Sequence, residues 1–367
     1  MKIAYYIRHT GLSGGVKVML QHVSLLKAAG YDALLVTKII DHQWTMEKAP
    51  EITRIGGMAE MPACDIYVGT NASDVYELHT GLKGIVVHLC QGYEPTDYEA
   101  RLRGEAVTDR YRRRGWCGRF RTWRDKAKFR RRIRGFERVY ALPTVKAAVS
   151  KHLAALVAGR YGQPCALIRN GIDVAVFHPD TTRVWGGAKI RLLSVGSAHV
   201  GFKGIPDTLE AVRMLKGRGV PVELVRVSPT DPGEEEGRVV DVFLKGLAEG
   251  QMAELYRGSD IFISSSLEGE GFGLPAVEAF ASGVPAILTD ISSYRNMGDA
   301  RDFACFVPQH SPGLIAEGVM RFIADSAFRE RCVREGLKVA ANFTLEGTRT
   351  DLVSFFDTLS KGRKGHS

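Results

Sequence analysis

Two glutamates, Glu270 and Glu278, flank a glycine-rich stretch and have the types and spacing that best suit chemistry. Seven residues, GFGLPAV, separate them. An ionised carboxylate only accepts hydrogen bonds, so hydroxyl groups of a sugar or ribose are its natural partners. Gly271 and Gly273 allow the backbone to approach a ligand closely, and the N–H groups at a helix start favour an anion such as a phosphate. The stretch therefore predicts a site for a phosphorylated sugar or nucleotide.

A strand, a loop, a helix and a second strand must position these groups, and the sequence predicts this order. Residues 261–263 are apolar, as in a buried parallel strand, and three serines follow them. Pro275 suits the first turn of a helix over about 274–282, because that turn tolerates a residue without an N–H. Gly283 ends the helix, and residues 284–288 predict the next strand. The loop thus lies at the carboxyl end of a strand, where open α/β sheets bind ligands.

Similar units are predicted elsewhere in the chain. Gly14 and Gly15 follow a predicted strand over 2–7 and precede a helix over 16–29, without the G-x-G-x-x-G spacing of dinucleotide enzymes. Lys203 lies between a predicted strand over 190–195 and a helix over 205–216. Other predicted segments are strands over 137–142 and 239–244, a helix over 145–158 and a solvated acidic loop over 231–236.

The paired glutamates resemble the signature of family 4 glycosyltransferases, retaining enzymes of the GT-B fold that use nucleotide sugars. The run NGID at 170–173, with Phe177 and Pro179, is similar to the N-G-[IV]-D-x-x-x-F-x-P element that closes the amino domain in that family. The resemblance implies an α/β protein of the GT-B class, with two Rossmann-like domains and a cleft between them. It also implies no cofactor and no metal, which agrees with the absence of a D-x-D motif.

The resemblance implies roles for individual residues. Glu270, Lys203 and Gln91 are the expected catalytic residues; Glu270 would hold the donor sugar and Glu278 the ribose, and neither would act as a nucleophile. The donor nucleotide-sugar is expected to contact Gly14, Gly15, Ser197, Lys203, Gly246, Glu270, Gly271, Phe272, Gly273, Leu274 and Glu278. The acceptor side is expected to comprise His88, Gln91, Tyr93 and Glu94.

Two positions depart from the family pattern. Ser197 stands where the family carries an arginine, so the phosphate charge must be neutralised in another way. Gln91 stands where many relatives have a histidine, and the run HLCQGYEP at 88–95 resembles a branch that includes bacterial rhamnosyltransferases. His88 is a second candidate for the histidine, with packing inside an apolar strand as the equal alternative.

Length and composition narrow the class of protein. A chain of 367 residues predicts two domains. Its six cysteines include no C-x-x-C pair, which disfavours zinc or a redox couple. The sequence has no apolar run of about 18 residues, and its amino terminus is too polar for a signal peptide. We therefore expect a cytoplasmic protein.

The segment 101–138 contains 16 Arg and Lys and four acidic residues, a net charge of +12 in a chain of +9. Trp116, Phe120 and Trp123 fall at helical spacing, which predicts basic amphipathic helices. Such helices bind an anionic membrane surface, here its inner face, or the phosphates of a lipid-linked acceptor. A solvated helical face is the alternative. Nucleic acid is not expected, because no nucleic-acid fold signature accompanies the charge.

The predicted domains are an amino-terminal acceptor domain over 1–179, a carboxyl-terminal donor domain over 180–344 and a last helix over 345–367 that packs back on the first domain. A linker is expected at 180–188. The predicted function is retaining, metal-independent transfer of a hexosyl or deoxyhexosyl group from a nucleotide-sugar to a glycan or lipid-linked acceptor, in bacterial cell-surface polysaccharide or glycoconjugate synthesis. The alternatives are a GT-B sugar-nucleotide epimerase and a non-enzymatic membrane- or nucleic-acid-binding protein with a degenerate donor site.

Overall fold

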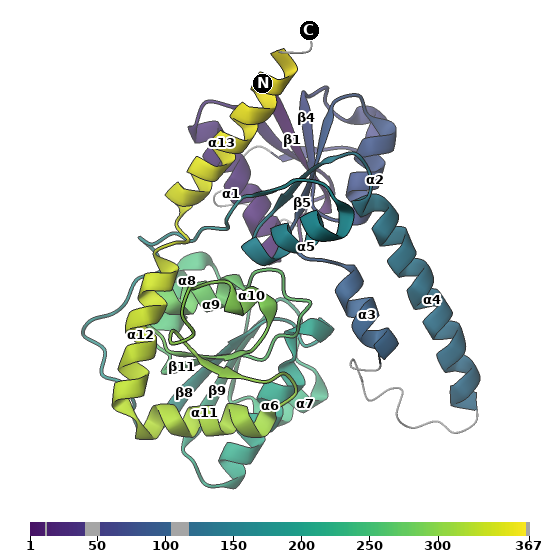
Figure 1. Cartoon of the computed structure of the whole chain (residues 1–367). Helices are drawn as coiled ribbons and strands as arrows, with labels where there is room; N and C mark the ends of the chain where they lie inside the picture. Colours follow the sequence, from purple (N-terminus) through teal and green to yellow (C-terminus); the bar gives the residue numbers. More distant parts are fainter. Residues whose placement is uncertain (12, 41–51, 104–116, 365–367) are drawn as a thin grey trace. The chain divides into compact units, whose positions relative to one another are not determined.

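The computed structural model describes residues 1–11, 13–40, 52–103 and 117–364. These residues form two compact units, each with its own sheet (Figure 1). Unit 1 comprises residues 1–168 and 351–367, and unit 2 comprises residues 169–350. The chain thus changes unit at 168/169 rather than at the expected 179/180, and the expected linker lies inside unit 2. The cleft expected between the domains stays a prediction.

Unit 1 contains a parallel sheet of seven strands in the order β3-β2-β1-β4-β5-β6-β7. The strands are β1 Lys2–His9, β2 Asp32–Ile39, β3 Ile52–Arg54, β4 Ile66–Gly69, β5 Ile85–Cys90, β6 Val145–Ala148 and β7 Cys165–Leu167. Strand β1 pairs with both β2 and β4, so the winding direction of the sheet reverses there. Its central strands are buried, as expected for a parallel sheet covered by helices.

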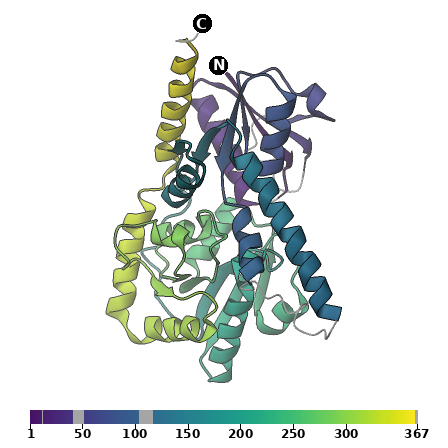
Figure 2. The ribbon, with the colours of Figure 1, turned by 45° about the vertical axis from the view of Figure 1, so that its right-hand side comes forward.

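The helices of unit 1 follow the strand–helix alternation of a Rossmann-like domain. They are α1 Gly14–Ala28, α2 Ala72–Gly81, α3 Pro95–Arg103, α4 Cys117–Tyr140 and α5 Lys151–Tyr161. Helix α4 runs alongside α3 (Figures 1 and 2). The last helix, α13 Leu345–Lys364, enters unit 1 at residue 351, where the Tyr31 hydroxyl donates to Asp357 over 2.5 Å. The end of the chain therefore packs on unit 1.

Unit 2 contains a parallel sheet of six strands in the order β10-β9-β8-β11-β12-β13. The strands are β8 Ile190–Val195, β9 Val222–Ser228, β10 Val242–Lys245, β11 Ile261–Ser264, β12 Ala286–Thr289 and β13 Cys305–Val307. The helices are α6 Ile205–Gly217, α7 Glu234–Val239, α8 Glu249–Arg257, α9 Leu274–Ala281, α10 Ser292–Arg295, α11 Pro312–Ala324 and α12 Ser326–Ala340. Both units confirm the predicted α/β class with two Rossmann-like domains.

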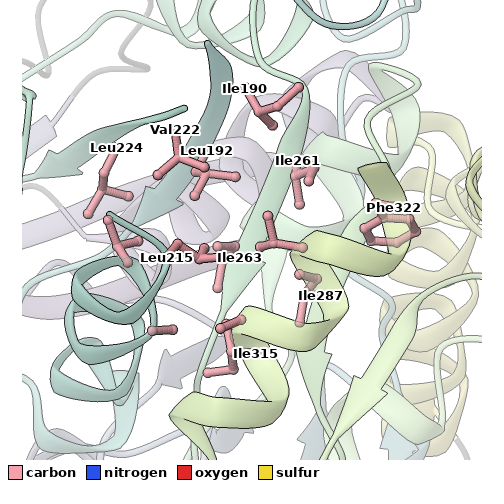
Figure 3. Packing of buried hydrophobic residues seen from close by; sticks show 14 of the residues in the cluster. Ile190, Leu192, Leu215, Val222, Leu224, Ile261, Ile263, Ile287, Ile315 and Phe322 are labelled. Atoms are coloured by element: carbon pink, nitrogen blue, oxygen red, sulfur yellow. The ribbon is translucent and has the colours of Figure 1, made fainter. Parts of the chain in front are cut away.

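The core of unit 2 lies between one face of its sheet and the helices α6 and α11 (Figure 3). Ile190, Leu192 and Ile261 project from the strands, and Leu215 and Ile315 meet them from the helices. These side chains are at most 8% exposed, so the sheet cannot shift without opening the core. This packing fixes where the loops at the carboxyl edge of the sheet begin.

The segment 137–148 differs from the prediction. Residues 137–140 complete α4 instead of starting a strand, and residues 145–148 form β6 instead of a helix. Residues 139–142, VYAL, form a short apolar run that suits a strand when taken alone. In the structure Phe136, Val139 and Tyr140 continue the apolar stripe of α4, because the helical period extends through them.

Residues 231–244 differ as well. Residues 234–239 form α7 rather than part of a solvated loop, and β10 begins at Val242 rather than at residue 239. Residues 231–235 are exposed, as expected of a solvated stretch, whereas Glu236 is buried and paired with Arg226, so the stretch is anchored to the sheet.

Candidate functional site

Lys203 and Glu270 form an ion pair at the carboxyl edge of the sheet in unit 2, with 2.6 Å between Nζ and Oε2. Lys203 follows β8 and Glu270 follows β11, and these strands are neighbours. The winding direction of the sheet reverses between them, which is where such sheets bind ligands. Ser266 also donates to Glu270, over 3.2 Å. Two of the predicted catalytic residues therefore contact each other, although Lys203 is expected to bind the phosphate and Glu270 the donor sugar.

The loops that carry this pair, residues 196–204 and 265–273, are joined by close contacts. A Cβ atom at Gly204 would lie 1.8 Å from the carbonyl oxygen of Ser265, so only glycine allows this approach. The Ser265 hydroxyl donates to the Gly204 carbonyl over 2.7 Å, and the Leu267 N–H donates to the Phe202 carbonyl over 2.7 Å. The two loops therefore hold Lys203 and Glu270 in one rigid arrangement.

Helix α9 begins next to Glu270, and no side chain caps its first turn. Its N-cap, Gly273, has a φ of +94°, and a Cβ there would lie 2.3 Å from the ring of Tyr294. The Tyr294 hydroxyl shares a hydrogen bond of 2.6 Å with Ser264. The glycine is required both by its backbone angle and by the aromatic ring beneath it. The helix start is thus presented beside Glu270, as the sequence predicted.

Glu278 lies on α9, and its carboxylate accepts a hydrogen bond of 3.0 Å from Tyr256. Burial raises the pKa of Tyr256 well above its usual range, and the neighbouring Glu278 carboxylate raises it further, so Tyr256 stays a donor. Phe272, by contrast, is buried in edge-to-face contact with Phe343. Its side chain packs in the interior of unit 2, so any contact of Phe272 with the nucleotide-sugar donor must come from its backbone. Leu274 is likewise buried.

The remaining residues of unit 2 that are predicted to contact the nucleotide-sugar donor follow β8 and β10. Ser197 is buried, and its hydroxyl lies 2.9 Å from that of Thr230 and accepts from the His199 N–H over 3.2 Å. Gly246 follows β10 with a φ of +67°. Both lie at the same edge of the sheet as Lys203, because all strands of this sheet are parallel.

Glu268 has a role that the sequence reading missed. Its carboxylate accepts from the Ser292 N–H over 3.1 Å and pairs with Arg295 over 3.2 Å. It therefore holds the start of α10 against the site, which leaves Glu270 as the carboxylate that faces Lys203. The sequence shows two acidic residues in this loop, Glu268 and Glu270, but the partners of Glu268 come from a later segment of the chain.

In unit 1, Gln91 and Gly15 lie together. The side-chain amide of Gln91 donates to the Gly15 carbonyl over 3.1 Å, and a Cβ at Gly15 would lie 2.3 Å from the Gln91 oxygen. Gly14 and Gly15 lie in the first turn of α1, which starts two residues before the predicted helix, and Ser13 caps it. The structure thus places Gly15, which is predicted to contact the nucleotide-sugar donor, against Gln91, which is predicted to be catalytic.

The other acceptor-side residues are used inside unit 1. His88 is fully buried with its ring 4.5 Å from that of Tyr140, and burial lowers its pKa to about 3. Glu94 accepts from the Ala72 N–H at the start of α2 over 2.9 Å and from the Tyr140 hydroxyl. Tyr93 is buried against Tyr161, with 2.8 Å between hydroxyls. In the structure these three side chains make packing and hydrogen-bond contacts within unit 1, and their expected contacts with an acceptor stay predictions.

The described part of the basic segment is exposed along α4. Its apolar residues Phe129 and Phe136 pack on Tyr98 of α3, with ring centroids 5.9 and 5.6 Å apart. The exposed basic residues on the rest of the helix are Arg124, Lys126, Lys128, Arg130, Arg131, Arg132, Arg134 and Arg138. Trp116 lies outside the described residues, as do the side chains of Phe120 and Trp123. Phe129 and Phe136 are thus used in packing, and the outward surface of the described part is basic.

A cavity of about 430 Å³ in unit 2 lies at the opposite edge of the sheet, near the amino ends of β11 and β12. Arg183, Trp185, Arg257 and Arg329 are among its lining residues. None of the predicted site residues lines it. Within the described parts of the chain, no group of three or more His, Cys, Asp and Glu side chains could hold a metal ion. The described helices also include none with the length and apolar character of a membrane span.

Comparison with known proteins gives one family match, over residues 237–339, to the model described as glycosyl transferases group 1. The MMP alpha-(1->4)-mannosyltransferase of Mycolicibacterium hassiacum is 36% identical over 126 residues, 32% of this chain and 29% of that protein. The phosphatidyl-myo-inositol mannosyltransferase of Mycobacterium tuberculosis is 23% identical over 210 residues, 54% of this chain and 55% of that protein. The chain thus spans about half or less of the curated relatives it matches.

Solved structures show the same fold. Sucrose-phosphate synthase from Thermosynechococcus elongatus has a TM-score of 0.72 at 15% identity and covers 98% of this chain and 99% of its own. WaaG, a glycosyltransferase involved in lipopolysaccharide biosynthesis, has a TM-score of 0.69 at 16% identity, with 95% and 97% covered. HepE of Anabaena, solved with UDP-glucose, has a TM-score of 0.72 at 13% identity, with 98% and 100% covered.

Proposed function

We propose that the protein is a retaining, metal-independent glycosyltransferase that moves a hexosyl or deoxyhexosyl group from a nucleotide-sugar to a glycan or lipid-linked acceptor. The fold, which is that of GT-B glycosyltransferases, and the match of residues 237–339 to the group 1 family model support this proposal. The observation that carries the proposal is the Lys203–Glu270 pair beside the uncapped start of α9, at the point where the sheet of unit 2 reverses its winding.

The proposed chemistry assigns the two charges of the pair to different parts of the donor. The diphosphate binds Lys203 and the first backbone N–H groups of α9. These groups stabilise the negative charge that develops on the leaving diphosphate. Glu270 then accepts hydrogen bonds from hydroxyls of the donor sugar, and Glu278 from those of the ribose. Because Lys203 and backbone amides supply the positive charge, the reaction proceeds without a metal.

The bond from the sugar C1 to the diphosphate oxygen breaks, and a bond from C1 to the acceptor oxygen forms on the same face. The acceptor hydroxyl gives its proton to the departing phosphate oxygen. Gln91 is proposed to face the acceptor. The lipid-linked acceptor is proposed because the similar mycobacterial protein is named for phosphatidyl-myo-inositol. Synthesis of a cell-surface glycoconjugate at the inner face of the membrane fits this acceptor.

The basic surface of α4 supports a location at an anionic membrane. Phe129 and Phe136, which lie in the described part of the helix, pack on Tyr98 of α3, so the proposed contact is electrostatic rather than an insertion of the helix. A charge-only contact is weakened by salt, because ions screen it over about 8 Å at physiological ionic strength. This property separates it from an inserted amphipathic helix, whose apolar area resists salt.

A screen of UDP-, GDP-, ADP- and dTDP-sugars by thermal shift tests the function. One donor should stabilise the protein and be slowly hydrolysed, and transfer to an acceptor should keep the anomeric configuration in NMR and survive EDTA. Glu270→Ala should abolish turnover with the fold intact, while Glu210→Ala on the exposed face of α6 should be fully active. Stabilisation by no donor, or full activity of Glu270→Ala, contradicts the proposal.

A further inference from the structure

Strand β9 places an arginine in the interior of unit 2, next to the loop that carries Lys203. Arg226 is fully buried and lies beside Ser194 in the register of β9 and β8. A charged side chain in this position requires a partner, because desolvation of an ion is expensive. Glu236 on α7 provides it: its Oε1 lies 3.1 Å from Nη2 and 3.3 Å from Nε.

The other donors of Arg226 bind the backbone where β8 ends. Nη1 donates to the carbonyl of Ser194 over 3.0 Å and to its hydroxyl over 3.1 Å, and Nη2 donates to the carbonyl of Gly196 over 2.5 Å. An apolar residue of similar size could fill the space but could not hold two carbonyl groups. The planar fork of donors is the property that the site uses.

Gly196 connects this arginine to the ion pair of the candidate site. Its φ of +136° turns the chain out of β8, and a Cβ there would lie 3.2 Å from Cδ of Lys203. The methylene stem of Lys203 therefore rests on Gly196 before its ammonium reaches Glu270. A continuous series of contacts runs from Glu236 through Arg226 and Gly196 to Lys203.

The loop over 197–204 contains no arginine of its own. We infer that the buried pair Arg226–Glu236 positions this loop, and with it Lys203, for the diphosphate of the nucleotide donor. The inference rests on the proposed function. Arg226 does not touch the ligand; it acts through the carbonyl of Gly196, and Glu236 keeps its guanidinium in place. The pair is thus a positioning device beneath the phosphate-binding loop.

Arg226→Lys tests this role, because lysine keeps the charge and loses the fork of donors. Binding of UDP, GDP, ADP and dTDP is measured by calorimetry, and binding of the matching nucleosides by ligand-observed NMR. The diphosphate that binds best should lose about tenfold in affinity, which corresponds to about 1.4 kcal/mol. The nucleoside, which has no phosphate, should bind as before. Arg191→Lys is the matched control, since Arg191 pairs with Glu223 across the same two strands at their amino ends.

A purely structural role gives a different result. It would lower the melting temperature and leave the ratio of diphosphate to nucleoside affinity unchanged, which would overturn the inference. Glu236→Gln provides a second variant: hydrogen exchange of the amides over 196–204 should speed up relative to those of α11. Unchanged exchange there would also overturn it. If the unaltered protein binds none of the four diphosphates, the proposed function itself fails; binding that Arg226→Lys leaves intact removes only this inference.

Discussion

Lys203 and Glu270 satisfy each other's charge across 2.6 Å, and their side chains are 20% and 10% exposed. An ammonium has three donors and a carboxylate accepts several hydrogen bonds, so each group has capacity for a ligand beside the other. In the proposed donor complex the diphosphate accepts from Lys203, and sugar hydroxyls donate to Glu270. A neutral ligand offers Lys203 no opposite charge, which is why the proposed donor carries a phosphate and a sugar in one molecule.

Lys203→Met should weaken binding of a nucleoside diphosphate by about 10- to 100-fold, because a hydrogen bond to a charged group contributes about 1.5–3 kcal/mol. Calorimetry of the diphosphate measures the change. Lys338→Met is the control: its ammonium pairs with Glu335 on the surface of α12, where such a pair contributes about 0.5 kcal/mol to stability. If the Lys203 variant binds the nucleoside diphosphate as tightly as the unaltered protein does, the phosphate does not bind at this loop.

Tyr256→Phe should reduce the free energy of unfolding by about 1 kcal/mol, since it removes the hydrogen bond to Glu278 and leaves the ring packed. Nucleotide binding should weaken modestly, because Glu278 loses the donor that orients it. Urea unfolding and calorimetry check the two effects. Tyr76→Phe, at an exposed position on α2, should change neither. A stable variant with unchanged affinity would show that Tyr256 does not orient Glu278.

Gly204→Ala should destabilise unit 2 more than its positive φ alone explains. Gly204 and Gly219 have φ angles of +60° and +73°, but only Gly204 would place a Cβ against another chain segment. The backbone angle costs about 1–2 kcal/mol at either position, and overpacking adds about 1–3 kcal/mol at Gly204. Urea unfolding of both alanine variants measures the difference. Equal losses would mean that the two loops are not held together at this point.

The sequence predicts the parts of the site that depend on local pattern. The glycine loop before α9 and the lysine before α6 follow from strand, glycine and helix signals within about 15 residues. The pairing of Lys203 with Glu270 does not, because it joins residues 67 positions apart through the order of strands in the sheet. Strand order is a tertiary property. Local sequence patterns therefore predict which residues belong to the site but not which of their side chains contact one another.

His88 and Arg226 show what a single strand leaves undecided. His88 lies within the continuous apolar run of β5, and in the structure its ring packs against Tyr140 from α4. Arg226 carries a signal in the sequence, because a lone arginine within the otherwise largely apolar run VELVRVS requires a partner if the strand is buried. Its partner, Glu236, lies in the stretch 231–236, for which the sequence predicts a solvated loop. The sequence therefore does not predict the Arg226–Glu236 pair.

Acidification should destabilise unit 1 through His88. Burial lowers its pKa from about 6.5 to about 3 in the folded state, so between these values the unfolded chain binds a proton that the folded chain does not. Stability is complete above the unfolded pKa and falls as the pH drops. His88 alone should remove about 2 kcal/mol between pH 7 and pH 5. Urea unfolding of His88→Phe at both pH values should show a loss smaller by that amount; an equal loss would contradict its burial as a neutral ring.

Vesicles that contain phosphatidylglycerol should bind the protein through α4, and vesicles of phosphatidylcholine should not. Replacing Arg130, Arg131 and Arg134 with Gln removes three exposed charges that each contribute about 1 kcal/mol near an anionic surface, so the partition coefficient should fall about 100-fold. Raising the salt concentration should have a similar effect on the unaltered protein, because ions screen a contact made by charge and Phe129 and Phe136 of α4 are packed on α3.

The control for this measurement must change the net charge equally. Arg213, Arg218 and Arg334 are exposed on α6, after its end and on α12, and their replacement with Gln also removes three charges. If net charge alone governs binding, both triple variants will lose affinity equally, and α4 is not the contact surface. Binding that persists in high salt would instead indicate an inserted apolar segment. Preference for RNA over anionic vesicles at equal phosphate concentration would assign the basic surface to nucleic acid.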